Sequence, residues 1–187
     1  MKLFWTASYT GKAQYQKNYD LVSRAIDSQP DLEIISTEKG NYLDLVPPTV
    51  REKLQAHPTK LHYDAVRRGI LWSDAVIIEI SQEDFQLGHE ATLAMQSKKH
   101  VLCLSIHEDF SEKISNRYFH GAKYNRTTIE EQIESFLKLA QKDLLSRRFN
   151  LFLTSSQEQF LKAKGIESGE GASDYLRSLI DQDRAES

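Results

Sequence analysis

Hydrophobic residues along this chain fall into two alternating patterns. Short, nearly continuous apolar runs at 2–7, 32–37, 75–80 and 101–106 are typical of strands buried on both faces of a parallel sheet. Between these runs, apolar residues recur at helical spacing, and the clearest such stripe lies at 129–144. Strands that alternate with helices predict an α/β fold of three layers, a flavodoxin-like or Rossmann-like parallel sheet with helices on both faces.

A different pattern begins near residue 145. Residues 148–153 alternate like a strand, and Ser155 stands three positions before Glu158, which is the spacing of a capping box at a helix start. We therefore predict an α/β domain over 1–144 and a small strand-helix-helix appendage over 145–187. The appendage is too short to bury a core alone and must pack on the main domain or on a second copy.

The composition narrows the range of functions. A formal charge of −3 argues against a mainly electrostatic nucleic-acid binder. The apolar runs are too short to span a bilayer and the first residues lack a signal-peptide core, so we expect a cytoplasmic protein without membrane contact. The single cysteine, Cys103, cannot form a disulfide within these residues, and the histidines show no ligand spacing. We expect neither a metal nor a cofactor.

The segment richest in candidate chemistry follows the apolar run at 75–80. A polar loop leads to Gly88-His89-Glu90, where we expect a helix to begin. A carboxylate in the first turn of a helix is favoured in its ionised form, and an ionised carboxylate is a competent nucleophile towards an oxocarbenium-like carbon. Gly88 would allow close approach of a ligand to the backbone. The alternative interpretation is that Glu90 only stabilises the start of its helix.

These residues resemble the central motif of the nucleoside deoxyribosyltransferase and deoxynucleotide N-hydrolase superfamily: an aspartate-led strand that starts at Asp74, a loop, and Gly-x-Glu. The resemblance covers most of residues 2–106. It implies that Glu90 attacks the anomeric carbon of a deoxyribosyl group and displaces the base. It also implies that Asp84, six residues earlier, contacts the sugar; an aspartate there, where the hydrolases typically have serine, favours a nucleoside over a 5′-nucleotide.

The opening strand and loop resemble the first motif of the same superfamily. From this likeness we expect substrate contacts at Phe4, Ser8, Tyr9, Thr10 and Gly11. The family usually has tyrosine where Phe4 stands, and an aspartate that helps to protonate the leaving base where Val66 stands. Asp64 is the nearest substitute and is a further substrate-binding candidate. In the family a neighbouring subunit completes the pocket, and residues 116–125 are the expected source here.

The tail resembles a ribbon-helix-helix module, in which paired strands of two chains enter the DNA major groove. The resemblance implies DNA contacts from Arg148 and Asn150, while the alternative is a dimerisation arm of the same geometry. We therefore carry three hypotheses: an N-glycosidic-bond enzyme acting on deoxyribonucleosides or deoxyribonucleotides; a catalytically degraded nucleotide-sensing domain fused to a DNA-binding regulator; and an oligomeric scaffold. The first two imply a homodimer or a higher homo-oligomer.

Overall fold

A computed structural model describes residues 1–144, 151–168 and 171–186 of the chain. The chain divides into two compact units, which we call the sheet unit (Met1–Ser146) and the tail unit (Arg147–Ser187). The elements of the sheet unit are β1 (Lys2–Ala7), α1 (Lys12–Asp27), β2 (Glu33–Ser36), the 3₁₀ helix η1 (Asn41–Leu45), α2 (Pro48–Leu54), α3 (Pro58–Trp72), β3 (Ala75–Glu79), α4 (Phe85–Gln96), β4 (His100–Ser105), β5 (Phe119–Lys123) and α5 (Ile129–Leu144). The tail unit contains α6 (Ser155–Ser168) and α7 (Ala172–Glu186). Within these residues, no helix is both long and apolar enough to cross a bilayer.

The sheet unit is built on five parallel strands in the order β2-β1-β3-β4-β5. This confirms the predicted α/β class, and the order is that of flavodoxin-like folds. The chain goes from β1 outward to β2 and then returns to place β3 on the other side of β1. The connections after β1 and β3 therefore diverge, and parallel sheets bind ligands in the crevice that this divergence leaves at the carboxyl ends of the strands.

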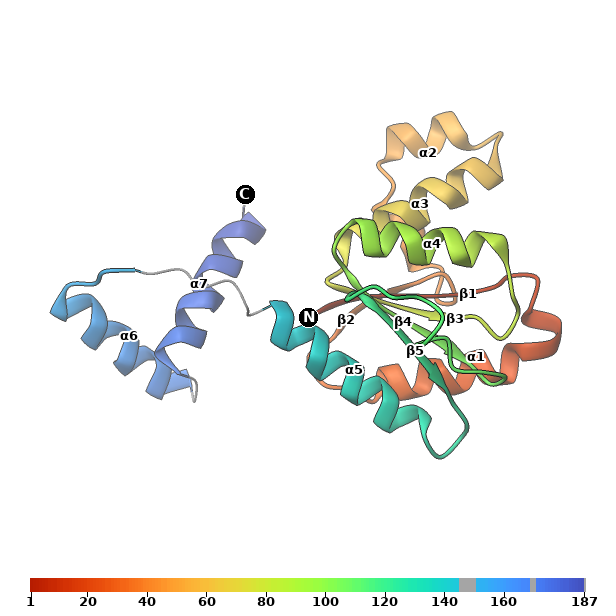
Figure 1. Cartoon of the computed structure of the whole chain (residues 1–187). Coiled ribbons are helices and arrows are strands. Elements are labelled where there is room, and N and C mark those ends of the chain that lie inside the picture. Colours follow the sequence, from red (N-terminus) through yellow and green to blue (C-terminus); the bar gives the residue numbers. More distant parts are fainter. Residues whose placement is uncertain (145–150, 169–170, 187) are drawn as a thin grey trace. The chain divides into compact units, whose positions relative to one another are not determined.

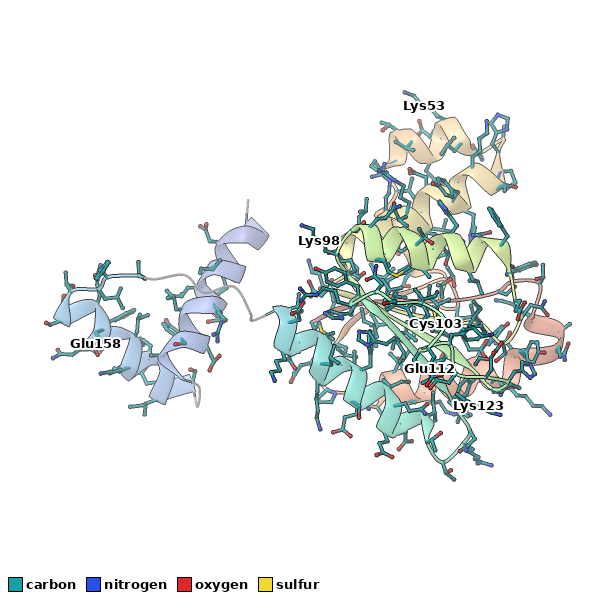
Figure 2. The ribbon with its side chains drawn as sticks, in the orientation of Figure 1. Lys53, Lys98, Cys103, Glu112, Lys123 and Glu158 are labelled. Carbon is teal, nitrogen blue, oxygen red and sulfur yellow. The ribbon has the colours of Figure 1, made fainter. Side chains whose placement is uncertain are left out.

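Helices cover both faces of the sheet (Figure 1). Alternate residues of each strand point to opposite faces. Trp5 and Ile77 pack with α1 and α5 on one face, and Phe4 and Val76 pack with α3 and α4 on the other. The strands are buried on both sides and so need apolar residues at almost every position. Cys103 lies in this interior (Figure 2), where burial raises the pKa of its thiol to about 12. It is a packing residue, as its apolar surroundings in the sequence indicate.

The edge strand β5 is not among the strands predicted from the apolar runs. Its sequence carries no Val, Ile or Thr, and Phe119 is the one buried residue in it. Gly121 is required here, since a Cβ at this position would lie 2.3 Å from the backbone nitrogen of Ser111. The strand exists because it pairs with β4, and that long-range pairing leaves little trace in local sequence.

In its described residues, the tail unit contains the two packed helices α6 and α7. The predicted strand is not found in the described part of 148–153, because Leu151–Leu153 has no sheet partner among the described residues; Arg148 and Asn150 lie outside them. The capping box lies one residue earlier than predicted: the Thr154 hydroxyl accepts from the Gln157 backbone N–H, and the Thr154 N–H donates to the Gln157 side chain.

Candidate functional site

A cavity of about 550 Å³ lies at the carboxyl ends of β1 and β3, where the strand order reverses. One part of its wall comes from the end of β1 and the loop after it, between Thr6 and Lys12. A second part comes from Asp84, Gln86 and Glu90 at the start of α4. The remainder comes from residues 37–62, which run from the end of β2 into the start of α3. The predicted rim of the sheet thus carries a cavity large enough for a nucleoside-sized ligand.

Glu90 reaches this cavity from the second turn of α4 with only 3% of its surface exposed. Its Oε1 accepts a hydrogen bond from Gln86 Nε2 at 3.0 Å. Its Oε2 is buried and has no hydrogen-bond partner among the described residues. Burial raises the pKa of Glu90 to about 7, and the nearby negative charge of Asp84 acts in the same direction, whereas the interactions with Gln86 and Thr6 lower the pKa.

The helix that carries Glu90 begins at Phe85, three residues before the predicted start at Gly88. Asp84 is its N-cap residue, because Oδ1 accepts from the Gln86 backbone N–H at 2.9 Å. The expectation that Glu90 lies in the first turn, held ionised by the helix dipole, is therefore wrong. The dipole effect fades after the first turn, and burial dominates instead.

Asp84 lies in the cavity wall, as expected for a ligand-contacting residue, but both of its oxygens are engaged. While Oδ1 caps α4, Oδ2 accepts from the Ser8 hydroxyl at 2.8 Å. Ser8 in turn lies 2.9 Å from the Thr10 hydroxyl. Together with Tyr9, which is 80% exposed, these loop residues line the cavity. Asp84 thus joins the loop after β1 to the start of α4.

Four of the predicted contact residues are not in the cavity wall. Phe4 is fully buried on the α3 face, and Gly69 leaves room for its ring. Asp64 forms an ion pair of 2.7 Å with Arg68 on the same helix. Gly88 is exposed on α4, and nothing lies within 4 Å of where its Cβ would be.

Gly11, the fourth, is the residue before α1. A Cβ at this position would lie 2.2 Å from the Tyr19 hydroxyl, so the glycine serves close packing beneath the loop rather than contact with a ligand. Phe4, Gly11 and Gly88 were expected at the site from their places in the motifs, and Asp64 as a substitute for Val66; the structure places none of the four in the cavity wall.

Sequence reasoning missed the part of the wall formed by Tyr42 and His62. Tyr42 belongs to η1 and His62 to α3, and the Tyr42 hydroxyl lies 2.9 Å from His62 Nδ1. Burial lowers the pKa of His62 and raises that of Tyr42. Pro58 and Thr59, at the start of α3, complete this wall. Nothing local marks the pair, because it forms only when η1 packs against α3.

The remaining charged groups in the wall neutralise each other. Lys12 Nζ lies 3.0 Å from Glu38 Oε1, and the other Glu38 oxygen accepts from Gln16 Nε2 at 3.2 Å. Lys12 also lies 5.6 Å from the centre of the Tyr9 ring. With this pair satisfied, the carboxylate of Glu90 is the group in the wall that is buried, titratable and incompletely hydrogen-bonded.

A second buried carboxylate, Glu79, lies at the end of β3 on the α1–α5 face. It accepts from the Ser81 hydroxyl and backbone N–H and, at 2.9 Å, from the Tyr124 hydroxyl. Burial raises its pKa. The Ser81 hydroxyl oxygen also accepts from the Ile106 N–H, so Glu79 fixes the turn that leads from β3 towards Asp84. A glutamate closing an apolar strand was the available sequence clue.

Another hollow, of about 420 Å³, lies between β5 and α5. His120, Gln132 and Phe136 line it, and its wall holds no buried carboxylate. Nor do the residues that the structure describes include a group of three or more metal-ligating side chains suited to an ion. The cavity beside Glu90 is therefore the better candidate for chemistry.

The fold, the cavity and the carboxylate can be set against known proteins. A scan against protein-family models finds no match for this chain, and a search of curated proteins finds none either. Any assignment of function therefore depends on the geometry of the site.

Proposed function

We propose that this protein cleaves the N-glycosidic bond of a deoxyribonucleoside or deoxyribonucleotide and passes the deoxyribosyl group to water or to a second base, with Glu90 as the nucleophile. The observation that carries the proposal is the unpartnered Oε2 of Glu90 in a cavity at the reversal of the sheet. A buried carboxylate oxygen without a donor is costly unless a ligand group meets it. An electron-poor carbon, with positive charge developing beside it, is such a group.

In the proposed reaction, Glu90 Oε2 forms a bond to C1′ of the sugar while the bond from C1′ to the base nitrogen breaks. The electron pair of that bond leaves with the base, which takes up a proton. Water, or the nitrogen of a second base, then attacks C1′, gives up a proton to the solvent and releases the carboxylate. Gln86 holds the other carboxylate oxygen throughout, and Asp84 together with Ser8 forms the part of the wall nearest to the start of α4.

The test is base release from a mixed pool of deoxynucleosides and their 5′-monophosphates, followed by chromatography. Wild-type protein should release base, and Glu90→Gln should lose at least about 1,000-fold in rate, because the amide is not a nucleophile. Glu112→Gln, in an exposed loop, is the matched control and should keep full activity. Absence of release by the wild type, or equal release by Glu90→Gln, would contradict the proposal.

A second candidate function is a nucleotide sensor coupled to DNA binding through the tail unit. It is favoured by Phe4 and Val66, which are packed core residues where the superfamily has catalytic groups, and by the separate two-helix unit at the end of the chain. Gel shifts across a salt series test it. Salt-sensitive binding that is lost in Arg148→Ala and Asn150→Ala supports the sensor, and absence of binding by the wild type removes it.

A further inference from the structure

The cavity wall built by Tyr42 and His62 contains the group best suited to protonate a leaving base. This step builds on the proposed function, which requires a proton for the departing base but leaves its source open. The aspartate expected from the superfamily is replaced by Val66, and the nearest carboxylate, Asp64, is paired with Arg68 away from the cavity. Another donor in the wall must therefore supply the proton.

The other polar groups in the wall are poor donors for this purpose. Asp84 accepts from Ser8 and from the α4 backbone, so both of its oxygens are already engaged. Glu38 accepts from Lys12 and Gln16, and the Lys12 ammonium is held by the same ion pair. Tyr9 lines the cavity but is 80% exposed, so nothing in the wall holds its hydroxyl in place.

We propose that His62, oriented by Tyr42, donates the proton to the base that leaves C1′. In the protonated ring, Nδ1–H donates to the Tyr42 hydroxyl oxygen, and Nε2–H has no partner among the described residues and is left for the ligand. As the bond from C1′ to the base breaks, the Nε2 proton passes to a ring nitrogen of the base. His62 is left neutral and takes its next proton from water.

The surroundings of the His62 ring also favour the release of its proton. Burial disfavours the charged form of His62 and so makes the protonated ring a stronger acid than a free imidazolium. A positioned general acid contributes roughly 100-fold to 10,000-fold to a rate, provided that the leaving group needs a proton. The contribution disappears when the leaving group needs none, and this difference separates an acid from a residue that only supports the wall.

The test compares two purine substrates, as deoxynucleosides and as 5′-monophosphates. Ordinary deoxyguanosine needs a proton to leave, whereas 7-methyl-deoxyguanosine already carries a positive base and leaves without one. We expect His62→Gln to slow the cleavage of deoxyguanosine at least about 100-fold and the cleavage of 7-methyl-deoxyguanosine less than about 3-fold. Tyr42→Phe should show a smaller loss in the same direction, because it keeps the ring and removes only the hydroxyl.

His89→Gln is the matched control, since His89 is exposed on α4 and makes a similar contact, at 3.3 Å, to the Tyr63 hydroxyl. It should leave both rates unchanged. The methylated base is also lost spontaneously, so the rate measured with Glu90→Gln is subtracted from the rate measured with each other protein. If wild-type protein cleaves both substrates and His62→Gln slows them equally or not at all, the role of His62 is wrong while the proposed function stands. If wild-type protein cleaves neither, the proposed function on purines fails, and the role of His62 fails with it.

Discussion

At the scale of single residues, Glu90 combines two properties that oppose each other. Its burial beside Thr6 and Gln86 leaves one carboxylate oxygen in the cavity wall without a hydrogen-bond partner among the described residues. The same burial raises its pKa to about 7, so near neutral pH a large part of the protein holds a protonated, non-nucleophilic Glu90. A ligand that brings positive charge to Oε2 would shift this balance towards the reactive form.

The pH dependence of the reaction follows from that balance. Because the nucleophile must be ionised, cleavage of 7-methyl-deoxyguanosine, which needs no proton from His62, should rise as pH increases through about 7, instead of through the region near 4.5 that is usual for a glutamate. Initial rates of base release between pH 5 and 9 measure this. A rising limb centred below pH 5.5 would show that Glu90 titrates like an exposed carboxyl and is not buried as described.

Stability should depend on pH in the opposite sense. The folded state binds the Glu90 proton more tightly than the unfolded state, so folding is favoured at low pH and loses free energy as pH rises from 4.5 to about 7. The shift corresponds to a loss of at most roughly 3 kcal/mol. Glu90→Gln removes the titrating group, and should therefore gain stability over wild type at pH 8 but not at pH 4.5.

Urea unfolding of both proteins at both pH values checks this prediction. Glu112→Gln is again the control, because an exposed glutamate should change the pH dependence little. An identical gain at pH 4.5 and at pH 8 would attribute the effect to packing instead of ionisation.

At the scale of elements, the start of α4 organises the site. Asp84→Ala removes the N-cap of α4 and the bond from Ser8, so we expect a loss of about 1–2 kcal/mol in the free energy of unfolding. Asp84→Asn keeps a capping oxygen and should cost less. Asp109→Ala, which removes a similar hydrogen bond to a backbone N–H in an exposed loop, should stay within about 0.5 kcal/mol in the same urea titrations.

The hydrophobic pattern of the sequence predicted the elements that bury a continuous apolar face. It missed those that form only through contacts with distant parts of the chain. The run at 75–80 and the stripe at 129–144 match β3 and α5 closely, since burial there demands hydrophobic residues in order. The start of α4 was missed because Phe85 is 93% exposed, so it adds nothing to the apolar stripe. The strand β5 depends on pairing with β4, which its short sequence does not reveal.

The candidate site was predicted in part for the same reason. Glu90, Asp84 and Ser8 follow predicted strands, and the carboxyl ends of parallel strands meet at one edge. Tyr42 belongs to η1 and His62 to α3, and the two meet because these elements pack against each other. The periodicity of hydrophobic residues does not reveal how the chain runs between them. That part of the cavity needed the three-dimensional structure.

At the scale of the whole molecule, the tail unit leaves large apolar side chains uncovered. Phe152 is 97% exposed and Ile166 80% exposed, and two helices in 41 residues cannot bury a full core. We expect a second copy of the chain to cover them. The full chain with Phe152→Ser and Ile166→Ser should therefore have a smaller mass in solution by light scattering than wild type.

The control for this prediction is Phe85→Ser, which removes a side chain of similar exposure from the sheet unit and should leave the mass unchanged. If the doubly substituted chain keeps the wild-type mass, assembly does not depend on these residues of the tail unit.

The three-part wall of the cavity has a consequence for how such a protein could change its ligand. The nucleophile and its supports stand on β1 and α4, whereas Tyr42, Pro58 and His62 belong to one continuous segment, residues 37–62, that runs from the end of β2 into the start of α3. Randomising that segment with His62 kept would change what is recognised and leave both the nucleophile and the proposed acid in place.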